Sequence, residues 1–395
     1  MMKTRTLLLF AALVLCVSMR AQTFTLGADI SWETEMLAKG YTFANAKGES
    51  RECAALMREL GLNAIRLRVW VNPSDGYCNK DDVLAKATKA AAQGMDIMID
   101  FHYSDSWADP GKQNIPAAWK SYSYAEMLEA VKTHTKDVLN HLKENGIPVR
   151  WVQVGNETSN GLLWDVGKAS ANPAQYAGII DAGYEAVKSV VPEAIVVVHL
   201  DNGFDNGLYK WNLGVLKNNG ARFDMVGMSL YPYSAVEWHN IQNTETAVQQ
   251  CIDNVNWVWE TYGVPSMIVE TGMKVAKADE GKQLLTLLLN SAYTKTNGHC
   301  QGVMYWEPEA PSGYNGGYDM GAFSASAQKQ CTPTAIMNAF TEFAAETGVK
   351  IPETSHAAQS EACYDLLGRY MQNSEKAHFS SIVITTDGKK LHTSH

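Results

Sequence analysis

The chain has 395 residues and a formal net charge of -9, with 46% hydrophobic and 19% charged residues. This length can hold one large barrel domain of about 250 residues or more, with room for loop insertions. The acidic balance argues against nucleic acid and anionic membranes as partners and suits a neutral substrate. The composition has no biased tract and is typical of a globular protein.

The first 21 residues differ from the rest of the chain. Lys3 and Arg5 precede an apolar run, Leu7–Val17, that is too short for a membrane span, and Ala21-Gln22 offers a cleavage junction. This pattern is typical of a secretory signal peptide. We therefore expect export to the periplasm, the cell surface or the medium, and no transmembrane segment in the mature chain.

The cysteines give little functional information. Cys16 suggests a lipoprotein site, but Leu15 before it is not the small residue that such sites normally need, so export without a lipid anchor is expected. No cysteine spacing matches a metal site, and the sequence does not specify a disulfide pairing. Buried thiols or structural disulfides are favoured over a catalytic role for the six cysteines that remain after cleavage: Cys53, Cys78, Cys251, Cys300, Cys331 and Cys363.

Short apolar runs alternate with segments of helical periodicity from Leu26 onward. The expected strands are Leu26–Asp29, Ala64–Trp70, Asp96–Phe101, Trp151–Val154, Ile195–Leu200, Met225–Leu230, Met267–Val269 and Gly302–Tyr305. The expected helices are Ser50–Leu60, Asp81–Ala92, Ser123–Asn145, Pro173–Val190, Asn206–Leu216, Glu245–Tyr262, Gly281–Lys295 and Pro333–Glu346. Eight such pairs predict an α/β fold, a (β/α)8 TIM barrel over residues 22–347. A doubly wound sheet would need a Gly-rich phosphate turn after its first strand, and the sequence has none.

The character of the sequence changes after Thr347. Residues 348–362 are interpreted as a linker, and residues 363–395 as a small C-terminal β tail. The tail contains an apolar run, Ile382–Thr385, followed by Asp387-Gly388, a dipeptide typical of hairpin turns.

Two of the expected strands end in a glutamate. Trp151–Val154 leads into Gly155-Asn156-Glu157, and Met267–Val269 leads into Glu270. In a parallel barrel these residues meet at the C-terminal mouth, where the catalytic groups of such barrels gather. Two carboxylic acids at one mouth can cleave a glycosidic bond, one as general acid and the other as nucleophile or base, and Asn156 can hydrogen-bond the sugar 2-hydroxyl.

Other polar and aromatic residues also fall at expected strand ends. Each of them alone is more often structural: an arginine in an ion pair, a histidine satisfied in the core, or a tryptophan that fills space. Their repetition at the strand ends favours a sugar-cleaving site instead. The residues concerned are Arg66, Arg68, His102, His199, Tyr231 and Trp306.

Five phrases of the sequence together resemble glycoside hydrolase family 53, a family of endo-β-1,4-galactanases. They are R-L-R-V-W-V-N-P from Arg66, D-F-H-Y-S-D-S-W-A-D-P-G-K-Q from Asp100, W-V-Q-V-G-N-E from Trp151, V-E-T-G from Val269 and Y-W-E-P from Tyr305. The resemblance covers about Leu26 to Glu346 and leaves out the tail. It implies a TIM barrel that acts on β-1,4-galactan, without an organic cofactor, and the chain is expected to be a monomer.

The resemblance also implies roles for individual residues. Glu157 would be the general acid/base and Glu270 the nucleophile of a retaining mechanism, with their carboxyl groups about 5 to 5.5 Å apart. Glu157 must then be protonated when substrate binds, so its pKa should exceed that of a free carboxyl. Substrate-binding roles are implied for Asn156, Arg66, Arg68, His102, Asp105, Trp107, His199, Tyr231 and Trp306.

The last strand–helix loop departs from the family pattern. Y-W-E-P is followed here by Glu309 and then by a Gly-rich segment through Gly321, so the distant subsites and the product length are open. Some relatives bind calcium in this loop, and Glu309 and Asp319 could supply oxygens, although no regular Asp-x-Asp spacing is present. Two alternatives also stay open: a retaining barrel endoglycanase acting on mannan, xylan or glucan, and a non-catalytic carbohydrate-binding protein.

Overall fold

The computed structural model describes residues 24–351 and four short strands further along the chain. The predicted signal peptide, most of the predicted linker and the Asp387-Gly388 turn lie outside the described residues. The four strands are β15 (Cys363–Tyr364), β16 (Tyr370–Met371), β17 (Ile382–Ile384) and β18 (Lys390–His392), and they form one antiparallel sheet in the order β16-β15-β17-β18.

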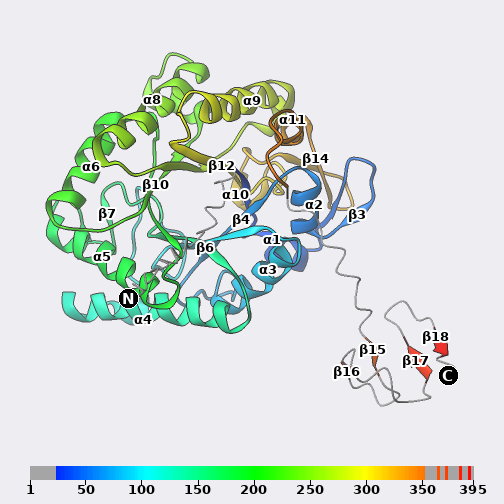
Figure 1. Cartoon of the computed structure of the whole chain (residues 1–395), viewed down its shortest axis with the longest axis horizontal. Coiled ribbons are helices and arrows are strands. Elements are labelled where there is room, and N and C mark those ends of the chain that lie inside the picture. Colours follow the sequence, from blue (N-terminus) through cyan, green and yellow to red (C-terminus); the bar gives the residue numbers. More distant parts are fainter. Residues whose placement is uncertain (1–23, 352–362, 365–369, 372–381, 385–389, 393–395) are drawn as a thin grey trace, which may run out of the picture.

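Eight parallel strands close a barrel within residues 24–351, in the order β1-β12-β11-β10-β9-β6-β5-β4 (Figure 1). Their bounds are β1 (Thr25–Asp29), β4 (Ala64–Val69), β5 (Asp96–Phe101), β6 (Val149–Val154), β9 (Ile195–Leu200), β10 (Met225–Leu230), β11 (Ser266–Thr271) and β12 (Cys300–Trp306). This closed parallel barrel confirms the predicted TIM barrel.

The outer helices surround the strands in chain order (Figure 1). They are α2 (Cys53–Glu59), α3 (Lys80–Ala92), α4 (Tyr124–Glu144), α5 (Pro173–Val190), α6 (Asn206–Asn218), α8 (Thr244–Tyr262), α9 (Ala278–Thr294) and α11 (Asn338–Thr347). Local sequence explains several of their ends. The capping box of Ser123 and Glu126 starts α4, and Gly263 ends α8 with a left-handed φ of 69°.

Two predicted helices begin later than expected because the residues before them pair as strands. Ser50 and Arg51 form β3 (Ser50–Arg51), so α2 starts only after the Glu52 cap. Likewise β14 (Gln330–Pro333) delays the last helix, which opens with the 3-10 turn η3 (Ala335–Met337). Together with β2 (Thr42–Ala44) and β13 (Phe323–Ala325), these strands form a small sheet that joins the first and last βα units.

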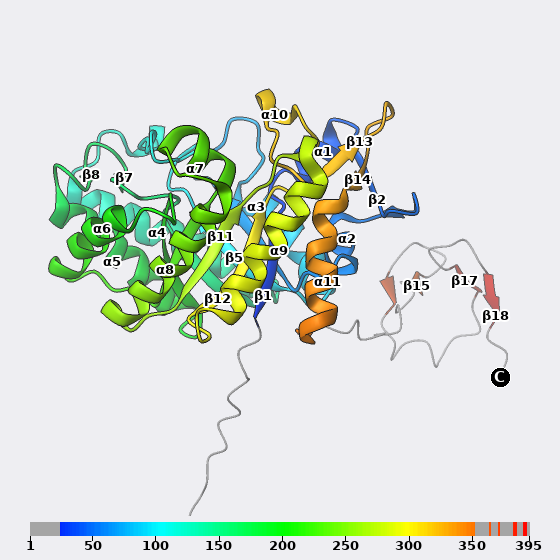
Figure 2. The same cartoon turned by 90° about the horizontal axis from the view of Figure 1, so that it is seen from above.

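Several short elements were not predicted. Figure 2 shows α7 and α10 together at one end of the barrel. These elements are α1 (Glu33–Ala38), α7 (Pro232–His239), α10 (Tyr314–Gly317), the 3-10 turns η1 (Ala117–Trp119) and η2 (Val275–Lys277), and the strand pair β7 (Gly161–Leu162) and β8 (Gly167–Lys168). Most of them lie in the loops that follow barrel strands, where a barrel enzyme builds its substrate site.

The barrel interior has an apolar part and a polar part. Buried side chains from seven of the strands fill the apolar part: Ala64, Met98, Trp151, Val197, Met225, Met267, Val269 and Met304. Two residues further along their strands, the period-two alternation brings Arg66, Asp100, Gln153 and His199 into the same interior, and all four are buried. The apolar layer is thus the floor on which the polar layer rests.

No helix among the described residues is both long and apolar enough to cross a membrane. Five of the cysteines lie within residues 24–351, and all five are buried and unpaired: Cys53, Cys78, Cys251, Cys300 and Cys331. Of the two expectations for them, buried thiols are therefore the one that the described residues adopt.

Candidate active site

A cleft of about 440 Å³ opens at the C-terminal ends of the barrel strands. Both predicted catalytic glutamates line it. The full lining is Trp32, His102, Trp107, Ala108, Asp109, Asn156, Glu157, Tyr231, Glu270, Trp306, Asn315 and Tyr318. The cleft therefore brings the two glutamates together with Asn156 and several aromatic rings, as cleavage of a glycosidic bond requires.

Glu157 reaches the cleft through a sharp turn after β6. Gly155 has a φ of 84°, and a Cβ at this position would lie 2.5 Å from Cγ2 of Thr158, so the turn requires glycine. Glu157 itself has a left-handed φ of 44°. Its Oε1 accepts a hydrogen bond of 2.6 Å from the hydroxyl of Ser229, and its backbone N–H donates to Nδ1 of His199 at 3.2 Å.

Glu270 faces the cleft because β11 is irregular. Met267 and Val269 both point into the barrel, so simple alternation would turn Glu270 outward. The pairing of β10 with β11 shifts by one residue at this point, since Met228 pairs with Ile268 but Ser229 pairs with Glu270. Such an irregularity re-aims a side chain, and here it brings Glu270 to the mouth of the barrel.

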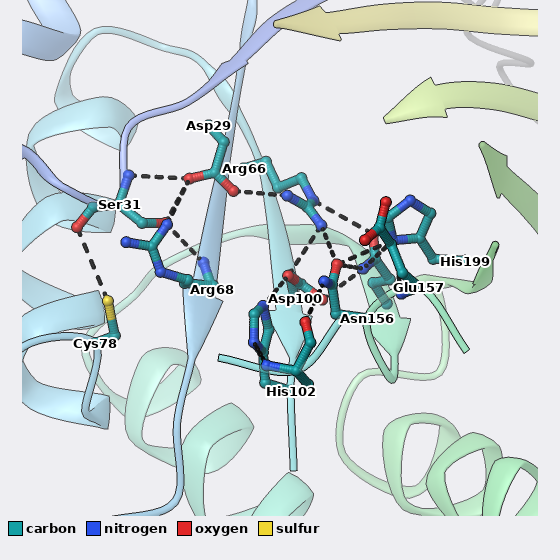
Figure 3. A network of polar contacts seen from close by, with 12 residues as sticks. Asp29, Ser31, Arg66, Arg68, Cys78, Asp100, His102, Asn156, Glu157 and His199 are labelled. Carbon is teal, nitrogen blue, oxygen red and sulfur yellow. Dashed lines mark hydrogen bonds and ion pairs between the residues drawn. The ribbon is translucent and has the colours of Figure 1, made fainter. Parts of the chain in front are cut away.

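Arg66 connects the parts of the site (Figure 3). One terminal nitrogen, Nη1, binds Asp29 at 2.8 Å. The other, Nη2, lies 2.9 Å from Asp100, 2.8 Å from Oε1 of Glu270 and 3.0 Å from Oδ1 of Asn156. Because the guanidinium is planar and stays charged, it fixes these groups relative to one another and steadies a negative charge on Glu270.

Arg68 has a different role, which the sequence could not separate from that of Arg66. It is fully buried and forms an ion pair with Glu307, not with either catalytic candidate. Its guanidinium carbon lies 4.3 Å from the ring centre of Trp107 and 5.5 Å from that of Trp32. Arg68 therefore supports the aromatic wall of the cleft from behind.

Aromatic rings form that wall as one packed group. Trp32 makes edge-to-face contacts with Trp107 and Trp306, at centroid distances of 5.8 and 5.0 Å. Trp306 also contacts Tyr318 at 5.0 Å, and the Tyr318 hydroxyl donates to the backbone oxygen of Trp306 at 2.8 Å. Rings held in this way can stack against the apolar face of a sugar.

His102 and Asp105 come from the same predicted phrase but lie in different places. His102 lines the cleft, with Nε2 3.0 Å from Asp100 and Nδ1 accepting from the indole of Trp70 at 3.2 Å. Asp105 does not line it. Its carboxylate instead accepts backbone N–H groups of Asn72 and Ala117, at 3.0 and 2.8 Å, and so braces the loop that carries Trp107.

The remaining predicted residues divide between the cleft and the layer beneath it. Tyr231 lines the cleft and donates to Oε2 of Glu270 at 3.3 Å. Asn156 lines it as well, whereas His199 is fully buried behind Asn156 and Glu157. Cleft and supporting residues without a predicted role are Asp29, Asp100, Asp109, Gln153, Ser229, Glu307, Asn315 and Tyr318. Several of them could have been found in the sequence as polar residues at inward-facing positions of the expected strands.

The two glutamates differ in acidity. Burial raises the pKa of Glu157 well above the usual carboxyl range, and the charges of Glu270 and Asp201 raise it further. Burial also raises the pKa of Glu270, to about 7, but the adjacent Arg66 opposes this rise. Glu270 therefore ionises first and Glu157 keeps its proton to a higher pH, which separates an acid from a nucleophile.

The last loop carries Glu309 and Asp319, the two residues predicted as calcium ligands. Among the described residues, no group of three or more His, Cys, Asp or Glu side chains is arranged to hold a metal ion. Glu309 is fully buried, where the neighbouring charge of Glu307 helps to raise its pKa, whereas Asp319 is exposed. The two residues thus differ in their exposure, and calcium binding in this loop stays a prediction.

The fold and the cleft define a barrel glycoside hydrolase that works with two carboxylic acids. Comparison with known proteins identifies the family of glycoside hydrolases. The model of glycosyl hydrolase family 53 matches residues 25–343, and the chain therefore belongs to this family. This result confirms the resemblance that the sequence phrases indicated.

Individual relatives agree with this assignment. The chain is 33% identical over 326 residues to arabinogalactan endo-β-1,4-galactanase A of Aspergillus niger, a match that covers 76% of this chain and 89% of that protein. It is 34% identical over 280 residues to a probable enzyme of the same name from Aspergillus fumigatus, covering 69% and 76%. A solved structure from a study of two fungal β-1,4-galactanases superposes with a TM-score of 0.71 at 28% identity, covering 80% of this chain and 98% of that one.

Proposed function

We propose that this glycoside hydrolase is an endo-β-1,4-galactanase that cleaves internal bonds of pectic galactan or type I arabinogalactan. The observation that carries the proposal is the pair Glu157 and Glu270 in one aromatic cleft, in a chain of family 53. The relatives named above are arabinogalactan endo-β-1,4-galactanases, which supports galactan over mannan, xylan or glucan.

The proposed mechanism is a double displacement that retains anomeric configuration. Glu270, ionised beside Arg66, attacks the anomeric carbon, while Glu157 protonates the departing glycosidic oxygen. Water activated by Glu157 then hydrolyses the glycosyl-enzyme ester, which returns both glutamates to their starting states. Asn156, held by Arg66, is placed to bind the 2-hydroxyl, and Trp306 to stack under the sugar that is cleaved.

The proposal extends to the cellular setting. The enzyme is exported and monomeric and acts on a neutral polysaccharide. Hydrolysis by two carboxylic acids needs no organic cofactor. The N-terminal pattern supports export, and N-terminal sequencing of the protein from an envelope or culture fraction should begin at or near Gln22. A protein that starts at Met1 in the cytoplasmic fraction would contradict export but not the catalytic assignment.

The experiment that tests the function measures reducing-end release from galactan, mannan, xylan and cellulose. The wild type should act on galactan alone, and Glu157→Ala and Glu270→Ala should each lose activity by a factor of about 100 or more. Cleavage of another glycan would overturn the substrate. Binding of galactan without cleavage by the wild type would leave the alternative of a carbohydrate-binding protein.

A further inference from the structure

Ser229 on β10 lies between the candidate acid/base and a buried histidine. Its Oγ is 2.6 Å from Oε1 of Glu157 and 2.8 Å from Nε2 of His199, and the side chain is almost completely buried. A hydroxyl has one proton, so it can donate to only one of these two atoms. Which one it chooses depends on the protonation of the histidine.

The surroundings of His199 determine which ring nitrogen carries the proton (Figure 3). The backbone N–H of Glu157 points at Nδ1 from 3.2 Å, and the amide nitrogen of Gln153 lies 3.0 Å from the same atom. Oδ1 of Asn156 also lies 3.0 Å from Nδ1, but this oxygen already accepts from Nη2 of Arg66 and from Nε2 of Gln153. The backbone N–H of Glu157 can only donate, so Nδ1 is the acceptor. Burial and the charge of Arg66 keep the pKa of His199 well below its ordinary value, so the ring is neutral and its single proton is on Nε2.

The direction of both hydrogen bonds follows. Nε2–H of His199 donates to Oγ of Ser229, which leaves the hydroxyl proton for Oε1 of Glu157. Oε1 is then an acceptor whether Glu157 is charged or protonated. No described residue hydrogen-bonds the second oxygen, Oε2, and Glu157 lines the cleft.

We propose that Ser229 is a positioning residue that reserves Oε1 of Glu157 as an acceptor and so places the catalytic proton on Oε2. The proposal rests on the function assigned to Glu157 above. In the first step the proton passes from Oε2 to the glycosidic oxygen, and in the second step Oε2 receives a proton from water. The proton of Ser229 is not transferred in either step.

The opposite histidine tautomer would give a different site. With the proton on Nδ1, two N–H groups would face each other, that of His199 and that of Glu157. Ser229 would then donate to Nε2 and could only accept from Glu157, which would hold the catalytic proton on Oε1. The two arrangements predict opposite roles for the same hydroxyl.

The test compares substrates that need acid assistance with substrates that do not. In a 2,4-dinitrophenyl β-1,4-galactobioside the dinitrophenolate departs without being protonated. The leaving sugar hydroxyl of galactan, in contrast, needs a proton from the enzyme. Ser229→Ala should lower kcat/KM on galactan by about 10- to 100-fold and on the dinitrophenyl substrate by less than about twofold. Ser229→Thr keeps a hydroxyl and should recover most of the loss. A matched control is Ser266→Ala, because Ser266 is also buried on a barrel strand but its Oγ has no hydrogen-bond partner in the described structure.

Glu157→Ala in the same assay separates the two proposals. If Glu157 is the acid/base, this variant also loses activity on galactan selectively, and added azide restores turnover of the dinitrophenyl substrate. A selective loss in Glu157→Ala together with an equal loss on both substrates, or no loss, in Ser229→Ala would overturn the role of Ser229 alone. An unselective loss in Glu157→Ala would overturn the acid/base assignment itself.

A second measurement reads the tautomer in the unaltered protein, and a variant is used only to assign the signal. A proton–nitrogen correlation spectrum of the histidine rings, with His199 assigned from its loss in His199→Gln, should show a bare Nδ1 and a protonated Nε2. The reverse pattern would overturn the proposal, because Ser229 could then not donate to Glu157.

Discussion

Glu157 and Glu270 lie at the same end of the barrel, but their carboxylates have different partners. Glu270 is bound by the guanidinium of Arg66 and by the Tyr231 hydroxyl. Among the described residues, the carboxylate of Glu157 has one hydrogen-bond partner, the neutral hydroxyl of Ser229, and the negative charges of Glu270 and Asp201 act on it as well. Burial raises the pKa of both residues, and the charge of Arg66 opposes this rise more strongly at Glu270, with which it forms an ion pair, than at Glu157. Because burial raises both pKa values, the unequal partners are what make one glutamate an acid and the other a nucleophile.

The first prediction concerns the loss of the Arg66 guanidinium, the cation that binds Glu270. Arg66→Met leaves Asp29, Asp100 and Glu270 buried without their shared partner, so the free energy of unfolding should fall by about 3 to 5 kcal/mol. The pKa of Glu270 should rise, and the acidic limb of the kcat/KM profile, which requires ionised Glu270, should move to higher pH. Urea denaturation and a pH–rate profile measure the two effects.

An exposed arginine provides the control for that prediction. Arg222 binds Asp181 with two contacts of 2.7 and 2.8 Å, but its side chain is 51% exposed. Arg222→Met should therefore cost no more than about 1 kcal/mol. Equal losses of stability in the two variants would contradict the view that the buried network depends on Arg66.

A second prediction displaces Glu157 without changing its charge. Gly155→Ala introduces a Cβ that would meet Thr158 at 2.5 Å at a position with a φ of 84°, so both the strain and the clash act on the turn that carries Glu157. The expected cost is about 1 to 3 kcal/mol of stability, together with a fall in kcat. Gly146→Ala has a similar φ of 74° but open space around it, so it should cost less and leave kcat unchanged.

The third and smallest effect concerns the charge that helps Glu157 to keep its proton. Asp201 raises the pKa of Glu157, so Asp201→Asn should lower it. Activity requires protonated Glu157, and the alkaline limb of kcat/KM should consequently move to lower pH while the acidic limb stays in place. A pH–rate profile in which the acidic limb moves instead would assign the charge effect to Glu270.

The alternation of apolar runs and helical segments was enough to predict the barrel and the strands that end in Glu157 and Glu270. Period two on β4 also placed Arg66 and Arg68 on one face. Their separate roles could not be predicted, because their partners Asp29, Glu270 and Glu307 lie on or directly after other strands, at least 37 residues away in the sequence. Nothing local distinguishes one arginine from the other.

The orientation of single side chains could not be predicted from the sequence either. Glu270 faces the cleft only because the register of β11 shifts, and a register shift depends on the neighbouring strand. Asp105 was expected among the substrate contacts, but its carboxylate is occupied by backbone N–H groups of its own loop and of the preceding one. Ser229 carried no signal at all, since an inward serine on a strand becomes informative only when Glu157 and His199 are seen on either side of it.

The most direct test of the two-glutamate mechanism is to trap the glycosyl-enzyme. A 2-deoxy-2-fluoro-β-galactobioside with a dinitrophenyl leaving group slows the second step more than the first, so the covalent ester should accumulate. Mass spectrometry of the digested protein should find the sugar on the peptide that contains Glu270, and no adduct should form in Glu270→Gln. An adduct on a different carboxylate, or hydrolysis with inversion and no adduct, would contradict the assignment of Glu270 as the nucleophile.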